Sequence, residues 1–113
     1  MTRLMPLTEE AFQAAVLEEC RLRGWRTAHF RPGMMRDGRW VTPVAGDGKG
    51  FPDILGLRGN RGIALELKVH PATQKKGQPM DEQRAWLVAF SDVGFESYVV
   101  RPGDEALLGE ILA

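Results

Sequence analysis

The stretch GFPDILGLRGNRGIALELKVH, from Gly50 to His70, carries the strongest strand pattern of the chain. Two apolar runs, residues 51–57 and 63–69, are rich in Ile, Leu and Val, and a turn with a glycine at each end separates them. This pattern is typical of a β-hairpin. We therefore expect two adjacent antiparallel strands at the centre of the fold.

The hairpin brings acidic and basic residues together. Because side chains alternate along a strand, the second run has one apolar face and one face that carries Glu66 and Lys68. We expect the turn to be centred between Asn60 and Arg61. That register sets Asp53 opposite Lys68 and diagonal to Glu66. Diagonal neighbours lie roughly 7 to 8 Å apart, a gap that a divalent cation could bridge.

This constellation suits the hydrolysis of nucleic acid. Two carboxylates, completed by waters and a phosphate, suit Mg²⁺ or Mn²⁺, and such a metal polarises a phosphodiester and activates water. A nearby ammonium can orient the attacking water and neutralise charge that grows on the phosphate. The alternative is an ordinary cross-strand ion pair, worth under about 1 kcal/mol when exposed.

The order of these residues resembles a known family. Pro52-Asp53 followed by Glu66-Leu67-Lys68 resembles the PD-(D/E)xK signature of restriction-endonuclease-like nucleases. With Gly50-Phe51 before the first motif, and Gln83, Trp86 and Leu87 after the second, the chain resembles the VRR-NUC family from about residue 9 to 102.

The resemblance implies an α/β (α+β) fold with a restriction-endonuclease-like core, in which helices flank a mixed central β-sheet. It implies one nuclease domain over residues 1–113, of the stand-alone type found in phages and bacteria. The implied activity is that of a Mg²⁺- or Mn²⁺-dependent endodeoxyribonuclease that cuts branched DNA, such as four-way (Holliday) junctions, as a homodimer. A nicking or restriction-like nuclease for ordinary duplex and a non-catalytic nucleic-acid-binding module are the alternatives.

The resemblance also implies a role for each residue of the hairpin motif. Asp53 and Glu66 would bind the metal, with the carbonyl of Leu67 as a further ligand. Lys68 would act on the attacking water. Gln83 would lie near the active site and help to position the lysine or the phosphate.

A carboxylate on the first helix would complete the metal shell. A helix is expected over residues 7–23, with Thr8 as its N-cap. Glu9 falls at the centre of its apolar sector, and Gln13 follows at i+4, so both would point the same way. The resemblance implies Glu9 as the additional ligand, with Glu10 as second choice. The alternative is that both glutamates only stabilise the helix N-terminus.

Composition narrows the class of protein. The chain has 113 residues, of which 43% are hydrophobic, enough for one small domain with a single core. Cys20 is the only cysteine, which excludes an intrachain disulfide and favours a reducing, cytoplasmic setting in a bacterial cell or a phage-infected host. No apolar run approaches the ~20 residues of a membrane span, so no membrane partner is expected.

The charge distribution favours nucleic acid as the partner. The formal net charge is zero, yet residues 21–61 contain nine Lys or Arg and three acidic residues. A concentrated basic surface supplies phosphate affinity even in a neutral protein, although a solvated Arg-rich loop is the alternative. The candidate nucleic-acid-binding residues are Arg31, Arg36, Arg39, Lys49, Lys75 and Lys76.

The remaining pattern predicts strands over 25–30 and 96–101 and helices over 81–93 and 102–113. Residues 31–50 are expected to form an extended loop or an irregular hairpin around Asp37-Gly38, and residues 71–78 a mobile surface loop. The helix at 81 departs from the family pattern, which has Ser or Thr and then Pro where this chain has Met80-Asp81, so Asp81 is expected to cap it. His29 is a weaker candidate for the site.

Overall fold

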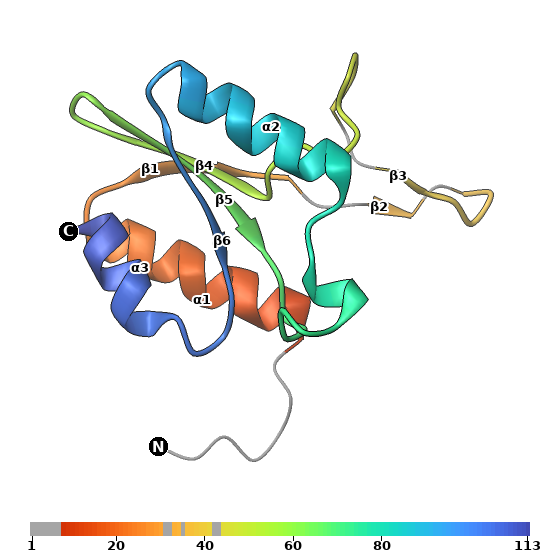
Figure 1. Cartoon of the computed structure of the whole chain (residues 1–113), viewed down its shortest axis with the longest axis horizontal. Helices are drawn as coiled ribbons and strands as arrows, with labels where there is room; N and C mark the ends of the chain where they lie inside the picture. The colour runs from red at the N-terminus through yellow and green to blue at the C-terminus, as the bar shows by residue number, and fades with distance from the viewer. Residues whose placement is uncertain (1–7, 31–32, 35, 42–43) are drawn as a thin grey trace.

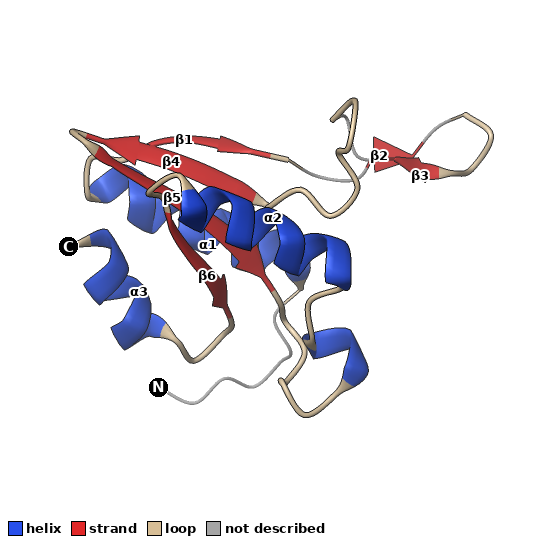
Figure 2. Ribbon diagram, turned by 45° about the horizontal axis from the view of Figure 1, so that its top comes forward, coloured by secondary structure: helices blue, strands red, loops and turns tan. Residues whose placement is uncertain are grey.

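The computed structural model describes residues 8–30, 33–34, 36–41 and 44–113. These residues form an α+β fold in which helices cover both faces of a mixed four-stranded sheet (Figures 1 and 2). The helices are α1 (Glu9–Leu22), α2 (Asp81–Asp92) and α3 (Glu105–Leu112), and the strands of the sheet are β1 (Arg26–His29), β4 (Ile54–Arg58), β5 (Arg61–Leu67) and β6 (Glu96–Val100). The α+β class and the order of these elements agree with the sequence prediction.

The sheet has the strand order β1-β4-β5-β6. β1 pairs antiparallel with β4, β4 pairs antiparallel with β5, and β6 lies parallel to β5. Parallel neighbours need a crossover connection, and α2 is the helix of that connection. α1 and α3 pack on one face of the sheet, and α2 lies on the other (Figure 2).

The central hairpin has a different register from the one that the sequence predicted. Ile54 pairs with Leu65 and Arg58 with Arg61, so the turn residues are Gly59 and Asn60. Gly59 has φ +59, and no non-glycine residue in the described ranges has a positive φ. A two-residue turn with glycine at its first central position is the type II′ arrangement that suits a twisted hairpin. Glycine thus sets the register.

This correction moves the pairing by two residues and therefore leaves every side chain on its predicted face. Continued past Ile54, the observed register sets Asp53 directly opposite Glu66 instead of opposite Lys68. Directly opposed side chains approach more closely than diagonal ones. The two carboxylates are therefore brought together more tightly than the sequence suggested.

The main hydrophobic core lies between the sheet and the α1/α3 layer. From the sheet it takes Ile54, Ile63 and Leu65, all with no exposed surface. The helices contribute Phe12, Val16 and Cys20 of α1, and Leu108, Ile111 and Leu112 of α3. The apolar sector predicted for α1 is confirmed, and Thr8 caps this helix as expected, with Oγ1 accepting from the N–H of Ala11 at 3.0 Å. Leu107 of α3 is 37% exposed.

The tip of the β4–β5 hairpin is fastened to the C-terminal end of α3 through Trp25. The Trp25 indole N–H donates to the Leu112 carbonyl at 3.1 Å. The guanidinium groups of Arg58 and Arg61 lie 4.6 and 5.0 Å from the centre of the Trp25 ring. Both arginines also donate to the Ala113 carbonyl oxygen. Two of the basic residues in the Arg-rich segment therefore have a structural role.

A second, two-stranded hairpin projects from the body of the molecule (Figure 1). It pairs β2 (Gly33–Met34) with β3 (Trp40–Val41), and an exposed turn around Asp37 and Gly38 joins them. This confirms the irregular hairpin predicted there. Leu7, the predicted start of the first helix, and Arg31, a candidate nucleic-acid-binding residue, lie outside the described part of the chain.

The loop after β5 is more structured than the sequence suggested. It contains a 3₁₀ turn, η1 (Lys75–Gly77). The Arg101 guanidinium donates to the Gly77 carbonyl at 2.6 Å, and the Gln78 side-chain amide donates to the Ala72 carbonyl. Gly77 is buried, and no larger residue fits there, because a Cβ would lie 1.9 Å from the Pro71 carbonyl oxygen. In the described residues, no helix has the length and apolar character needed to cross a membrane.

A substitution of Trp25 tests whether this residue fastens the hairpin tip to α3. Trp25→Leu should lower the free energy of unfolding by about 2 to 4 kcal/mol, because it removes a buried ring that is 5% exposed and its hydrogen bond to Leu112. Urea denaturation measures this change. As a control, Leu57→Ala on β4, where the side chain is 53% exposed, should change stability by less than about 0.5 kcal/mol. Equal effects would show that Trp25 does not fasten the tip.

Candidate active site

A cavity of about 720 Å³ opens between the N-terminal turn of α1, the open end of the β4–β5 hairpin and the start of α2. Eight of its lining residues are those that the sequence singled out around the proposed metal site. The lining residues are Thr8, Glu9, Glu10, Gln13, Phe30, Asp53, Glu66, Leu67, Lys68, Val69 and Gln83. Three segments that are far apart in sequence therefore meet around one pair of carboxylates.

Pro52 explains why the hairpin opens at this point. Ile54 and Leu65 form the last pair of the β4–β5 ladder, and the register would next pair Pro52 with Leu67. Proline has no N–H to donate, so the ladder cannot continue there. The Leu67 N–H donates instead to the Asp53 carboxylate at 2.8 Å. Because the N–H and C=O of a strand residue point to the same side, the Leu67 carbonyl also faces Asp53.

Gly50 lets this end of the hairpin approach α2. Its φ is +79, a conformation that favours glycine. A Cβ at Gly50 would lie 2.8 Å from the Gln83 backbone nitrogen and the Glu82 carbonyl carbon. Within four residues, Gly50 therefore allows close contact with α2, Pro52 interrupts the ladder and Asp53 supplies a carboxylate.

Glu66 is the most deeply buried charged residue of the site, with 2% of its surface exposed. Its Oε2 accepts from the side-chain amide of Gln83 at 2.7 Å and lies 3.6 Å from the Lys68 ammonium nitrogen. No N–H or O–H group of the described residues donates to Oε1. A buried carboxylate oxygen without a donor is costly, and a cation is the ligand that would satisfy it.

Burial raises the pKa of both carboxyl groups. The pKa of Glu66 is raised to about 8, first by burial and then by the negative charge of Asp53. Burial also raises the pKa of Asp53, while its hydrogen bond from the Leu67 N–H and the charge of Lys68 act in the opposite direction. Two adjacent carboxylates that cannot both ionise easily are typical of cation-binding and catalytic sites.

The donor set fits a hard divalent cation. Asp53 and Glu66 supply carboxylate oxygens and the Leu67 carbonyl faces the same space, which suits Mg²⁺ or Mn²⁺ with water in the remaining positions. Within the described ranges, no group of three or more His, Cys, Asp or Glu side chains is close enough to hold a metal alone. Glu9 as a third carboxylate ligand stays a prediction.

Glu9 and Glu10 both line the cavity. The charge of Glu9 contributes to the raised pKa of Asp53. Glu9 is exposed, and not at the centre of a buried sector as predicted, because the first turn of α1 extends to the open end of the hairpin. Gln13, one turn later, is 7% exposed and lines the cavity as expected.

Gln83 links the start of α2 to the site. Its side-chain oxygen accepts from the Met80 backbone N–H at 2.7 Å, while its amide nitrogen donates to Glu66. One side chain therefore both caps the helix and orients the buried carboxylate. The prediction that Asp81 caps α2 is wrong: Asp81 is the first helical residue and pairs with Arg84 at 3.2 Å.

The basic residues have different surroundings, and their role in nucleic-acid binding stays a prediction. Within the Arg-rich segment, Arg58 and Arg61 are committed to the C-terminal end of α3, and Arg39 and Lys49 pair with Asp37 and Glu82 at 2.6 and 3.3 Å. Arg36 is exposed on the projecting hairpin, and Lys75 and Lys76 are exposed on η1. Arg31 lies outside the described residues, and His29 does not line the cavity.

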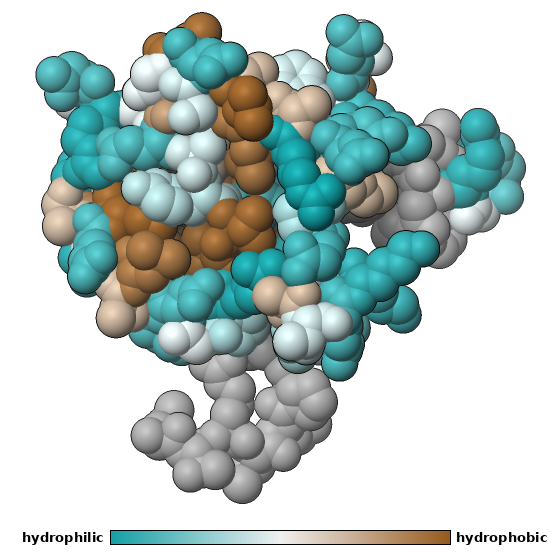
Figure 3. All heavy atoms as spheres, in the orientation of Figure 1, coloured by the Kyte–Doolittle hydropathy of each residue, from teal (hydrophilic) through white to brown (hydrophobic). Residues whose placement is uncertain are grey.

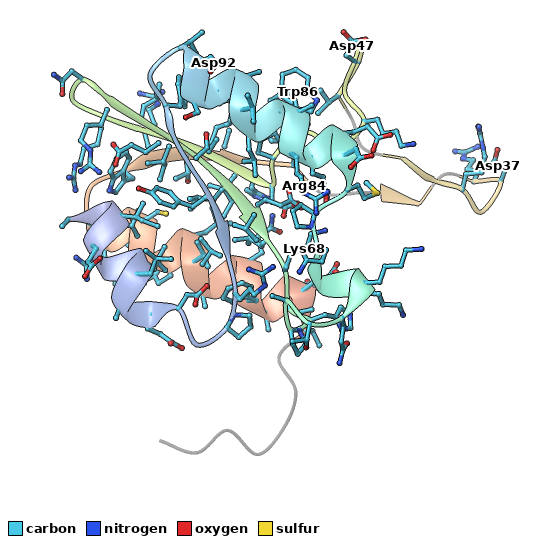
Figure 4. All side chains as sticks on the ribbon, in the orientation of Figure 1. Asp37, Asp47, Lys68, Arg84, Trp86 and Asp92 are labelled. Carbon is cyan, nitrogen blue, oxygen red and sulfur yellow. The ribbon has the colours of Figure 1, made fainter. Side chains whose placement is uncertain are left out.

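Polar residues nevertheless gather on the side of the molecule that carries these groups. Figure 3 shows hydrophilic surface over η1 and over the tip of the β2–β3 hairpin, whereas hydrophobic surface gathers over β6 and α3. Lys68 lies between α1 and α2, on the side of the molecule that carries η1 (Figure 4). Arg101, which holds the Gly77 carbonyl of that loop, was missed by the sequence analysis, because nothing local signals a contact that spans 24 positions.

Comparison of the chain with models of protein families, with curated proteins and with solved structures gives no match. The geometry described above is therefore the basis on which the function is inferred.

The raised pKa of Glu66 predicts how stability depends on pH. In the folded state Glu66 keeps its proton up to about pH 8, whereas its ordinary pKa is 4.5. The folded state therefore binds more protons, and this contribution to stability, complete below pH 4.5, is lost as the pH rises toward and through 8. In chelator, the stability of Glu66→Gln relative to the unmodified protein should increase from pH 5 to pH 9, as measured by urea denaturation. A constant difference would contradict the raised pKa.

Cation binding should become stronger as the pH rises, because the cation and the proton compete for Glu66. Mn²⁺ must displace the proton on Glu66, so its affinity and the rise in melting temperature it produces should be larger at pH 8 than at pH 6. Asp53→Asn and Glu66→Gln should each remove most of this response. Asp104→Asn is a control, because Asp104 accepts from the Arg101 N–H and does not line the cavity. An equal Mn²⁺ response in all variants would place the cation elsewhere.

Proposed function

We propose that this protein is a metal-dependent nuclease that hydrolyses phosphodiester bonds in DNA. The observation that carries the proposal is the open end of the β4–β5 hairpin. There, Asp53 and Glu66 face one cavity with the Lys68 ammonium beside them. This is the arrangement that the PD-(D/E)xK signature describes, and it favours a restriction-endonuclease-like core and a relation to the VRR-NUC nucleases.

Each residue has a role that its contacts support. Asp53, Glu66 and the Leu67 carbonyl would hold Mg²⁺ or Mn²⁺, which supplies polarisation of the phosphodiester and a lower pKa for bound water. Lys68 has a side chain only 16% exposed, with its nitrogen 3.6 Å from Glu66. Its ammonium can orient the attacking water and neutralise charge on the phosphate. Gln83 holds Glu66 in position.

Branched DNA is the proposed substrate. A cavity at one edge of the fold, flanked by the exposed lysines of η1 and by the projecting β2–β3 hairpin, can contact duplex arms on more than one side. One site cuts one strand, so paired cuts in a four-way junction need two sites, and we propose a symmetric homodimer. A cytoplasmic setting in bacteria or phage-infected cells follows from this substrate.

Two other functions are possible outcomes of the same experiment. A nicking or restriction-like nuclease would use the same carboxylates on ordinary duplex. A non-catalytic DNA-binding module is disfavoured, because a buried pair of carboxylates that faces phosphates would weaken binding unless a cation lies between them. The raised pKa of Glu66, to about 8, is a cost that a simple binding surface has no need to carry.

Cleavage should be measured on linear duplex, single-stranded, flap and four-way junction DNA, with Mg²⁺, Mn²⁺ or chelator. The unmodified protein should cut the junction fastest and only with metal. Lys68→Ala should bind the junction nearly normally and cut on the order of a hundredfold or more slowly in single-turnover reactions, because it removes a charge that acts in the transition state.

Lys75→Ala is the matched control, since Lys75 is exposed on η1 outside the cavity. It should weaken DNA binding and lower the salt dependence of binding by roughly 0.9 in slope, with no change in the single-turnover rate at saturating protein. Cleavage of linear duplex as fast as the junction, without cleavage of single strands, would favour the restriction-like alternative. Metal-independent binding without cleavage would favour the binding module.

A further inference from the structure

A second hollow lies beside the active site, between α2 and the glycine-rich loop at residues 46–49. Its volume is about 560 Å³, and it is an open trough, lined by Gly46, Asp47, Lys49, Glu82, Ala85, Trp86 and Ala89. The trough exists because Gly46, Ala85 and Ala89 have little or no side chain. Ala85 and Ala89 are exposed, so they do not pack a core.

Trp86 provides a fixed aromatic surface in this trough. Its indole N–H donates to the Asp47 carbonyl at 3.0 Å, which joins α2 to the loop. Its ring packs edge-to-face on Phe51, with 4.8 Å between centroids. Figure 4 shows Trp86 on the side of α2 toward the loop, while the Asp47 side chain points away from the helix. A ring that is held by the hydrogen bond to Asp47 and by the contact with Phe51 is already oriented to stack on a flat ligand.

The polar groups of the trough indicate what kind of flat ligand fits. Lys49 and Glu82 form an exposed ion pair at 3.3 Å. Glu82 would repel a phosphate inside the trough, yet its carboxylate can accept from the amino group of a nucleobase, while Lys49 can donate to a ring nitrogen or a carbonyl. A neutral ring with both donors and acceptors on its edge matches this pair better than an anion does.

The trough and the proposed active site are lined by neighbouring residues of α2. Glu82 lines the trough and the next residue, Gln83, lines the catalytic cavity. Phe51, against which Trp86 packs, precedes Asp53 by two positions. We propose that the trough holds an unpaired nucleobase, stacked on Trp86, of a DNA strand that is bound at the Asp53–Glu66 pair. This inference rests on the proposed nuclease function and adds recognition of unpaired bases next to the cut site.

The test uses oligonucleotide duplexes with one unpaired 2-aminopurine, bound in Ca²⁺ so that cleavage does not interfere. Stacking on Trp86 should quench the 2-aminopurine fluorescence. Ala89→Leu fills the trough without removing a core contact, and it should weaken binding of this DNA by roughly tenfold, within the range for loss of one base–aromatic stack. Its affinity for a fully paired duplex should not change.

Val88→Leu is the matched control, because Val88 is on the same helix, is 58% exposed and does not line the trough. It should behave like the unmodified protein. Photo-crosslinking with 5-iodouracil at the unpaired position should label Trp86. Equal binding of bulged DNA by Ala89→Leu, or crosslinks only elsewhere, would overturn the proposed base site while metal-dependent cleavage still supports a nuclease. Absence of both binding and cleavage in the unmodified protein would reject the proposed function itself.

Discussion

The burial of Glu66 is the constraint on which the rest of the site depends. A carboxylate with 2% exposure is unfavourable unless its charge is balanced or its proton is retained. Lys68 and Gln83 satisfy one oxygen, and the other has no donor among the described residues. The energy cost is concentrated where a cation would remove it. The burial of Glu66 therefore lowers the stability of the protein without a ligand and raises its affinity for a cation.

The backbone around Glu66 is arranged by residues that interrupt regular structure. Pro52 ends the β4–β5 ladder, which frees the Leu67 N–H for Asp53 and turns the Leu67 carbonyl toward the same space. Gly50 allows the chain to touch the first turn of α2. Leu65, the residue before Glu66, still pairs with Ile54 of β4 on one side and with Tyr98 of β6 on the other. The site therefore lies where a rigid sheet meets an interrupted edge.

Much of this arrangement could be predicted from sequence because it depends on local rules. Alternation along β5 assigns Glu66 and Lys68 to one face whichever turn is used. The register could not be predicted correctly, since Gly59 and Asn60 compete with Asn60 and Arg61 as turn centres, and the choice depends on a positive φ at Gly59. Charge counts identified a basic segment but not its surface, because Arg58 and Arg61 find partners about fifty residues away.

α2 connects the chemistry to the packing of the molecule. None of its twelve residues is fully buried, so the hydrophobic core does little to hold it. Its attachments include the Gln83–Glu66 hydrogen bond, the Trp86–Asp47 hydrogen bond and the aromatic contacts of Phe51 with Trp86 and Phe90. Because Gln83 both accepts from the Met80 N–H and donates to Glu66, a cation that fixes the Glu66 carboxylate would also act on the first turn of this helix.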